Sequence, residues 1–238
     1  MRGLYFINKP LSQDYTPDQL LRDCKTVLDA GRVGSGNIVA AVQYREKDPR
    51  IHPGQMDDVV EIARRMQTLC REYGVPFIMN DYVDVAIAIG ADGVHVGQDD
   101  MDLADVRSRV GPHSIIGVSC STLDEALVAQ EGGANYLGVA SIFTTVTKAD
   151  ATIIGIEGLQ GIRSQIDIPI VALGGVNFNN LSEVLGHSDS ICMISALYNE
   201  GGLSANVGRF STVYGSRPVT QSVLPVGSRG SSSAYVHR

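Results

Sequence analysis

Residues 77–97 read FIMNDYVDVAIAIGADGVHVG, and this stretch sets out the unit from which the fold is predicted. Its apolar ends, FIMND and GVHVG, are short and bounded by glycine or polar residues, which is typical of buried strands. A helix is predicted between them, beginning near Val83. A strand followed by a helix and a second strand is the repeat of a parallel sheet.

The same alternation of short apolar runs and amphipathic stretches continues from the N-terminus to about Ser195. Further strands are predicted to begin near Leu4, Ile38, Ile115, Tyr136, Pro169 and Ser190. Helices with apolar residues at about 3.6-residue spacing are predicted over 17–30, 56–73 and 123–130. Eight strands in this rhythm favour a single (β/α)8 TIM barrel over residues 1–200. An open, doubly wound sheet is the alternative, but no G-x-G-x-x-G follows the first strand.

The composition of the chain argues against several classes of protein. The chain has 238 residues, of which 44% are hydrophobic, and a formal net charge of −7. An acidic chain without a Lys/Arg-rich run is not expected to bind nucleic acid, so a small-molecule substrate is favoured. Cys24, Cys70, Cys120 and Cys192 are far apart, which predicts reduced thiols rather than a disulfide framework or a zinc ribbon. No signal-peptide core and no run of about 18 apolar residues occurs, so a soluble, cytoplasmic protein that does not engage a membrane is expected.

Residues 201–238 differ in composition from the rest of the chain. They contain four arginines and no acidic residue, and Gly, Ser and Pro are frequent. Such a segment is predicted to be largely disordered, because it offers little apolar surface to bury, and no clear eighth helix is expected. A linker to a partner domain is the alternative interpretation.

Polar residues end the second predicted strand, on the side of a parallel barrel where active sites form. This strand ends Gln43-Tyr44-Arg45-Glu46-Lys47, and its two-residue alternation puts Gln43, Arg45 and Lys47 on one face. If this face lines the barrel, two cations converge on a site suited to a phosphate or diphosphate. A solvated strand end is the simpler alternative.

Acidic residues end the next two strands, at Asn80-Asp81 and at Gln98-Asp99-Asp100. Because neighbouring strands lie about 4.8 Å apart, Asp81 and either Asp99 or Asp100 are predicted to share one magnesium ion. Alternatively, Asp81 caps the helix that follows it, and the second stretch is a polar turn. His95 is interpreted as a hydrogen-bonded core histidine rather than as a metal ligand.

Hydroxyl groups and glycines end the remaining strands. Ser119 is expected to hydrogen-bond a substrate, because no G-x-S-x-G elbow surrounds it as it would surround a nucleophile. The sixth strand leads into Thr144-Thr145-Val146-Thr147-Lys148, whose hydroxyls and cation suit phosphate oxygens. Gly174-Gly175 and Ile194-Ser195 end the last two strands, where many barrels bind phosphate through backbone N–H groups. A polar loop and ordinary turns are the alternatives for these stretches, but in combination with the cationic strand end they predict two phosphorylated substrates.

Over roughly Leu4 to Leu197 the chain resembles thiamine-phosphate synthase. The stretches that carry the resemblance are VQYREKD, NDYVDVAIAIGADGVHVGQDDM, IIGVSC, YLGVASIFTTVTK, PIVALGGV and MISAL, in this order. The resemblance implies a magnesium-dependent transferase that joins a pyrimidine diphosphate to a thiazole phosphate and releases pyrophosphate.

The resemblance also implies a role for individual residues. The pyrimidine diphosphate is expected to contact Gln43, Tyr44, Arg45, Glu46, Lys47, Asn80, Ser119 and Lys148, of which Arg45, Lys47, Ser119 and Lys148 take part in catalysis. Magnesium is expected at Asp81 and Asp100. The thiazole phosphate is expected at Thr145, Thr147, Gly175, Ile194 and Ser195.

Three features depart from the family pattern. Thr144 stands where the family usually has proline, residues 31–37 form a longer turn than usual, and the sequence after Tyr198 does not resemble the family's last helix. The core resembles synthase domains that are fused to a hydroxyethylthiazole kinase domain, which is not found in this sequence. An inactive barrel that retains ligand binding and a thiazole-tautomerase-like barrel are the alternative functions, and a homo-oligomer is a further expectation.

Overall fold

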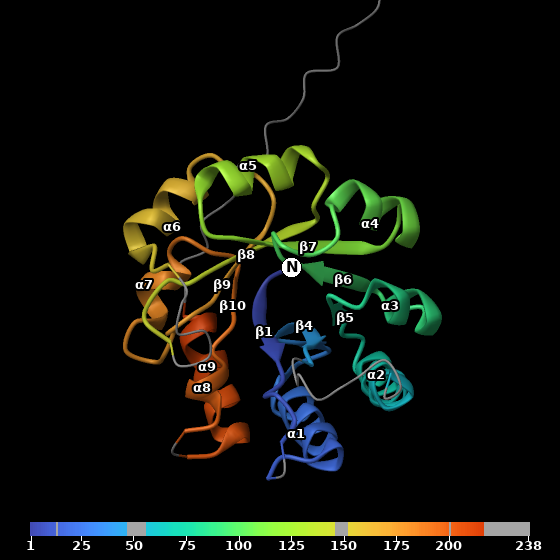
Figure 1. Ribbon diagram of the computed structural model, residues 1–238. Helices are drawn as coiled ribbons and strands as arrows, with labels where there is room; N and C mark the ends of the chain where they lie inside the picture. The colour runs from blue at the N-terminus through green and yellow to red at the C-terminus, as the bar shows by residue number, and fades with distance from the viewer. Residues whose placement is uncertain (13, 47–55, 146–151, 200, 217–238) are drawn as a thin grey trace, which may run out of the picture.

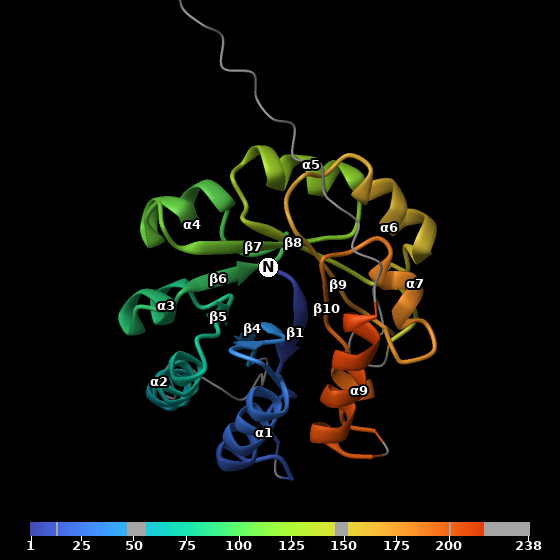
Figure 2. The same cartoon turned by 180° about the vertical axis from the view of Figure 1, so that it is seen from behind.

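A computed structural model describes residues 1–12, 14–46, 56–145, 152–199 and 201–216 of the chain. Eight parallel strands close into a barrel, and helices surround it on the outside (Figures 1 and 2). The barrel strands are β1 (Gly3–Ile7), β4 (Val39–Tyr44), β5 (Phe77–Asn80), β6 (Gly93–Val96), β7 (Ile115–Cys120), β8 (Tyr136–Val139), β9 (Ile170–Ala172) and β10 (Ser190–Ile191). Their order around the barrel is β1-β10-β9-β8-β7-β6-β5-β4, so the first strand pairs with the last. The predicted (β/α)8 barrel is confirmed.

Helices follow most of the strands, and two of them begin with the same capping device. The helices are α1 (Pro17–Ala30), α2 (Met56–Glu72), α3 (Val83–Ile89), α4 (Leu103–Val110), α5 (Leu123–Glu131), α6 (Gly155–Arg163), α7 (Leu181–Leu185), α8 (Ile194–Leu197) and α9 (Leu203–Gly215). At α1 and α5 the side chains of Thr16 and Thr122 accept the backbone N–H of Gln19 and Glu125. The side chains of Gln19 and Glu125 in turn accept the backbone N–H of the two threonines. These capping boxes fix where the two helices start.

The pleat of the strands sorts the apolar side chains into two layers. In β1, Tyr5 and Ile7 lie inside the barrel, where they pack with Tyr136, whereas Leu4 and Phe6 join the layer between strands and helices. This alternation is why β1 is buried along its whole length. Each fully buried large side chain contributes roughly 1.5–3 kcal/mol.

The longer turn at residues 31–37 forms a small hairpin. Arg32–Val33 (β2) and Gly36–Asn37 (β3) pair in the antiparallel direction outside the barrel. Asn37 ties this hairpin to the barrel, because its side chain donates to the carbonyl of Leu28 at 2.8 Å and accepts from the N–H of Val39 at 3.0 Å. Just after this hairpin, the pairing of β4 with β1 shifts by one residue between Leu4 and Tyr5.

Helix α9 (Leu203–Gly215) corrects the expectation that no clear eighth helix follows the last strand. Val207 and Phe210 are fully buried on one face of α9, which packs against α1 (Figure 2). Asn206 is also buried, and its side chain donates to the carbonyl of Leu197 at 3.0 Å. The helical spacing of these few apolar residues outweighs the lack of charge and the high glycine content. Residues 217–238 lie outside the described part of the chain.

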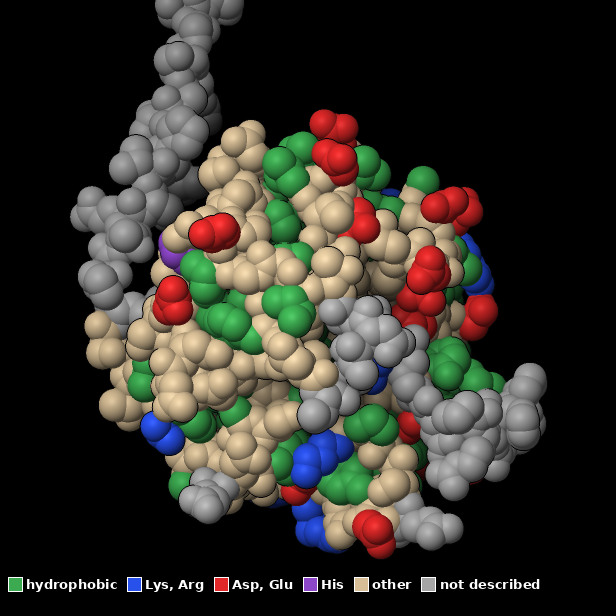
Figure 3. All heavy atoms as spheres, turned by 60° about the vertical axis from the view of Figure 1, so that its left-hand side comes forward, with side chains coloured by type: hydrophobic (Ala, Val, Ile, Leu, Met, Phe, Trp, Pro, Cys, Tyr) green, Lys and Arg blue, Asp and Glu red, His purple; other side chains and the backbone are tan. Residues whose placement is uncertain are grey.

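The described surface presents its large hydrophobic residues singly. Val33, Ile87, Val128 and Ile153 are the exposed ones, and they lie on or beside four different elements. On the face shown in Figure 3, hydrophobic side chains form small, separated groups. No helix in the described ranges has both the length and the apolar character needed to cross a bilayer.

Candidate active site

The C-terminal ends of neighbouring strands bring several predicted site residues together. A small cavity of about 80 Å³ opens inside this end of the barrel. Its lining consists of Tyr5, Ile7, Gln43, Arg45, Asn80, His95, Ser119, Tyr136, Gly138, Val171 and Leu173. Four of these, Gln43, Arg45, Asn80 and Ser119, were predicted from the sequence to meet one substrate. An apolar wall with a few convergent polar groups is typical of a small-molecule site.

Two amide groups in the cavity have no partner within the described part of the protein. Gln43 and Asn80 are 1% and 5% exposed, and the Nε2 and Nδ2 atoms of these side chains are buried without a hydrogen bond. An unsatisfied buried donor costs about 1–3 kcal/mol. Acceptor atoms of a ligand in the cavity would satisfy both groups.

Arg45 is held at the mouth of the barrel by a residue that the sequence analysis did not identify. Asn8, which is 1% exposed, accepts the N–H of Arg45 at 2.8 Å and donates to its carbonyl at 3.1 Å. The same amide also donates to the carbonyl of Lys9. Asn8 therefore ties the end of β4 to the end of β1 and fixes the backbone from which the guanidinium projects.

Tyr44 and Glu46 differ from Gln43 in position. Tyr44 packs in the outer layer between strands and helices, because it follows Gln43 in the pleat, and it does not line the cavity. Burial raises the pKa of Tyr44, and the neighbouring carboxylate of Glu46 raises it further. Glu46 is also fully buried.

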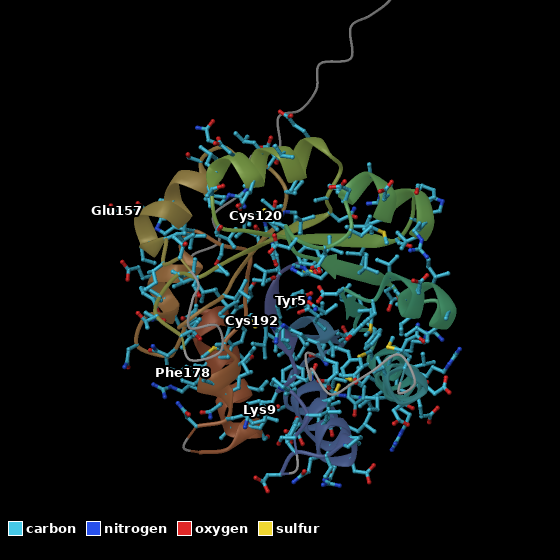
Figure 4. The ribbon with its side chains drawn as sticks, viewed as in Figure 1. Tyr5, Lys9, Cys120, Glu157, Phe178 and Cys192 are labelled. Atoms are coloured by element: carbon cyan, nitrogen blue, oxygen red, sulfur yellow. The ribbon has the colours of Figure 1, made fainter. Side chains whose placement is uncertain are left out.

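A chain of hydrogen bonds runs through the barrel to the cavity. The hydroxyls of Tyr5 and Tyr136 are 2.5 Å apart, the Tyr136 hydroxyl lies 2.9 Å from Nδ1 of His95, and Nε2 of His95 lies 2.9 Å from Oγ of Ser119. Figure 4 shows Tyr5 close to the centre of the ring of strands. The interpretation of His95 as a hydrogen-bonded core residue is confirmed. Burial lowers the pKa of His95 to about 4, Arg45 acts in the same direction, and Asp100 opposes them.

Asp81 and Asp100 end consecutive strands, as predicted for a cation site. Asp81 has a φ of 59°, and it is the one non-glycine residue of the described ranges with positive φ. Such a conformation costs of order 1–3 kcal/mol and is typical of functional sites. The N-cap of α3 is Tyr82, so Asp81 does not occupy the capping position. Asp100 turns back on its loop, where Oδ2 accepts the N–H of Gly97 at 2.7 Å.

The carboxylates of Asp81 and Asp100 suit a hard cation that takes only a few of its ligands from the protein. Among the described residues, no group of three or more His, Cys, Asp or Glu side chains is placed to bind a metal. Magnesium commonly uses one or two carboxylates and completes its shell with water and substrate phosphate oxygens. Two aspartates beside a cationic strand end are compatible with that mode.

Two of the segments in which a second phosphate site was predicted, the loops after β8 and β9, are in contact. The N–H of Phe143 donates to the carbonyl of Gly174 at 3.0 Å. At Gly175, which has a φ of 66°, a Cβ atom would lie 2.6 Å from the carbonyl oxygen of Thr144. The structure thus brings Gly175 beside the loop that contains Thr145. Ile194 and Ser195 begin α8, while Lys47, Thr147 and Lys148 lie outside the described residues.

Comparison with known proteins identifies the family. The family described as thiamine monophosphate synthase matches residues 4–197. A thiamine-phosphate synthase of Caldanaerobacter subterraneus subsp. tengcongensis is 41% identical over 182 residues, which cover 76% of this chain and 82% of that protein. One from Chloroflexus aurantiacus is 46% identical over 178 residues, or 74% and 78% of the two chains.

A solved structure agrees with these relatives. The thiamine phosphate pyrophosphorylase from Pyrococcus furiosus superimposes with a TM-score of 0.74 at 34% sequence identity, covering 90% of this chain and 95% of that one. Residues 4–197, which the family matches, contain all of the barrel strands except Gly3 at the start of β1, and all of the residues that line the cavity. The chain therefore belongs to the thiamine monophosphate synthase family.

Proposed function

We propose that this chain is a thiamine-phosphate synthase. It condenses 4-amino-2-methyl-5-hydroxymethylpyrimidine diphosphate with 4-methyl-5-(2-phosphoethyl)thiazole, giving thiamine phosphate and pyrophosphate. The observation that carries the proposal is the meeting of Arg45, Ser119 and two unpartnered amides in one cavity of a barrel from this family. The curated relatives bear the name of this transferase, and neither alternative function has comparable support.

The cavity accounts for recognition of the pyrimidine diphosphate. Gln43 and Asn80 offer buried N–H donors, and Arg45 supplies a fixed cation at the mouth. We assign Arg45, Lys47, Lys148 and Ser119 to the diphosphate, because cations and hydroxyls are suited to its oxygens. Asp81 and Asp100 would hold Mg²⁺, which when bound supplies further positive charge against the leaving pyrophosphate.

The residues act by electrostatics and positioning rather than by covalent catalysis. The bond between the pyrimidine methylene carbon and the diphosphate oxygen breaks, and its electron pair leaves with pyrophosphate. Arg45 stabilises the charge that develops on that oxygen. The thiazole nitrogen then donates its lone pair to the methylene carbon, so no general base is needed. Tyr5, Ile7 and Val171 give the cavity an apolar wall that limits the access of water.

The thiazole phosphate is assigned to the meeting point of the last loops. Gly175 permits close approach of its backbone, while Thr145 and Thr147 offer hydroxyls and Ile194 and Ser195 offer N–H groups at the start of α8. We therefore assign both phosphorylated substrates to one end of the barrel. A homo-oligomeric state and a cytoplasmic location stay predictions.

The decisive experiment measures both products. Purified protein is incubated with the two substrates and Mg²⁺, and thiamine phosphate and pyrophosphate are quantified with and without EDTA. Formation of both in equal amounts, lost on chelation and restored by added Mg²⁺, supports the proposal. Folded protein that forms neither product contradicts it and favours an inactive binding barrel.

Variants test the assigned residues. Arg45→Ala and Asp81→Ala should each lower kcat by about 10²-fold or more, because each removes charge stabilisation of the leaving group. Ser119→Ala should have a smaller effect, since a neutral hydroxyl contributes less. Arg22→Ala, on the exposed surface of α1, is the matched control for loss of a cation. Near-normal turnover in both of the first two variants would refute the assignment.

A further inference from the structure

The hydrogen-bond chain from Tyr5 to Ser119 has a direction that can be obtained by counting its hydrogens. Tyr5, Tyr136, neutral His95 and Ser119 each contribute one O–H or N–H hydrogen, and three hydrogen bonds join them. His95 is buried and both of its ring nitrogens face neutral hydroxyl groups, so we count one N–H hydrogen on the ring. Only one end of the chain, Ser119, is partly exposed, whereas Tyr5 is 2% exposed.

If every hydrogen in this series of hydrogen bonds points toward Ser119, each buried donor has an acceptor. Tyr5 then donates to Tyr136, Tyr136 donates to Nδ1 of His95, and the hydrogen on Nε2 is donated to Ser119 Oγ. The hydroxyl hydrogen of Ser119 is left free, at the wall of the cavity where a ligand can accept it. In the opposite direction, the hydrogen left over belongs to Tyr5, which lines the cavity but is only 2% exposed, packs with apolar side chains and has Tyr136 as its only hydrogen-bond partner among the described residues. An unsatisfied buried donor is unfavourable, so the first direction is preferred.

Two glycines on adjacent strands leave the space that the rings of His95 and Tyr136 occupy. A Cβ atom at Gly138 would lie 2.9 Å from Cε1 of His95, and one at Gly117 would lie 2.0 Å from Cζ of Tyr136. Each ring therefore occupies space that a side chain would otherwise fill. Close packing therefore helps to fix the positions of the two rings, in addition to the hydrogen bonds that join them.

We propose that His95 and Tyr136 are positioning residues that hold the Ser119 hydroxyl as a hydrogen-bond donor toward an anionic oxygen of the bound diphosphate. The inference rests on the proposed function for the identity of the ligand. The direction of the hydrogen bonds from Tyr5 to Ser119 does not depend on the identity of the ligand, because it is a property of the ligand-free protein.

The first test is spectroscopic and needs no activity. In ¹⁵N-labelled, ligand-free protein at pH 7, the ring nitrogens of His95 are identified by their loss in His95→Gln. The expected tautomer carries its hydrogen on Nε2, and Tyr136→Phe should shift the ring toward the Nδ1–H form. A His95 ring protonated on Nδ1 in the unsubstituted protein overturns the proposal, whether or not the protein makes thiamine phosphate.

The second test is kinetic and separates positioning from folding. His95→Leu should lower kcat about 10- to 100-fold with a small change in KM, because a hydrogen bond to a charged group is lost mainly in the transition state. His95→Gln should recover part of this loss, since its amide can donate to Ser119 and accept from Tyr136. Circular dichroism and thermal unfolding verify that each variant is folded.

Two further variants complete the kinetic test. Tyr73→Phe is the control: it removes a tyrosine hydroxyl that donates to Asp29 and does not line the cavity, so kcat and the His95 tautomer should stay near those of the unsubstituted protein. In a double-mutant cycle, adding Ser119→Ala to Tyr136→Phe should cost little more than either alone, because both act through one hydroxyl. Fully additive losses in folded double variants overturn the proposal.

Discussion

Asn8 illustrates how a single side chain away from the chemistry can set the geometry of a site. It makes hydrogen bonds to both the N–H and the carbonyl of Arg45. Asn8→Ala leaves these backbone groups without their partner, so we expect a loss of about 1–3 kcal/mol in unfolding free energy and a lower kcat/KM. Urea unfolding and steady-state kinetics check both effects. Asn179→Ala, at an exposed position, serves as the control, and equal kinetics for the two variants would contradict the role of Asn8.

Gly175 and Gly74 allow the cost of a close approach to be separated from the cost of backbone conformation. Their φ angles are 66° and 63°, but only Gly175 has atoms within 4 Å of the position of a Cβ. Alanine at either position costs roughly 1–2 kcal/mol for the left-handed conformation. Gly175→Ala should destabilise the protein further and raise the KM for the thiazole phosphate. The comparison uses chemical unfolding and substrate titration, and indistinguishable variants would remove Gly175 from the proposed phosphate site.

Sequence patterns located the residues that end strands, but not those that support them. Gln43, Arg45 and Asn80 could be predicted because the ends of parallel strands converge at one face of a barrel. Tyr5 and Tyr136 were missed, because their contact across the lumen depends on strand register. The alternation in LYFIN, which puts Tyr5 on the opposite face from its neighbours, was the available signal.

At the scale of elements, α9 is the part of the fold for which composition misled. Phe210 is fully buried and stacks at 5.5 Å on Tyr214, and α9 packs against α1. We expect Phe210→Ala to cost about 3–5 kcal/mol, the range for a large buried aromatic side chain. Thermal or urea unfolding measures this loss, with Ser204→Ala on the exposed face of the same helix as control. A cost below about 1 kcal/mol would mean that α9 is not integral to the barrel.

The β2–β3 hairpin shows the opposite outcome at the same scale. The sequence indicated a long turn at residues 31–37 between a helix and a strand, but it gave no reason to pair Arg32 with Asn37. Two-residue strands have too little periodicity to be recognised from sequence. Their placement outside the barrel explains why this insertion does not disturb the cavity.

At the scale of the whole molecule, the four cysteines report on integrity of the fold. All four are buried, and burial raises the pKa of Cys120 and of Cys192 to about 12. At pH 8 these two thiols stay protonated and shielded, so Ellman's reagent should react slowly with the folded protein and with four thiols per chain after denaturation. A thiol that reacts in the folded protein as fast as free cysteine would contradict the packing described for it.

The closed order of the strands pairs β1 with β10, the first and last strands of the barrel. β1 and α1 are synthesised before the other strands and helices of the barrel, and β10 and α9, which pair with and pack against them, are synthesised after those elements. One edge of β1 therefore has no partner while the ribosome makes the intervening elements, and unpaired strand edges are sites of intermolecular association. The nascent chain stays an open sheet until its last elements leave the exit tunnel. Over that interval, the unpaired edge of β1 is open to association with other chains, and we expect chaperones that shield strand edges to raise the yield of folded protein.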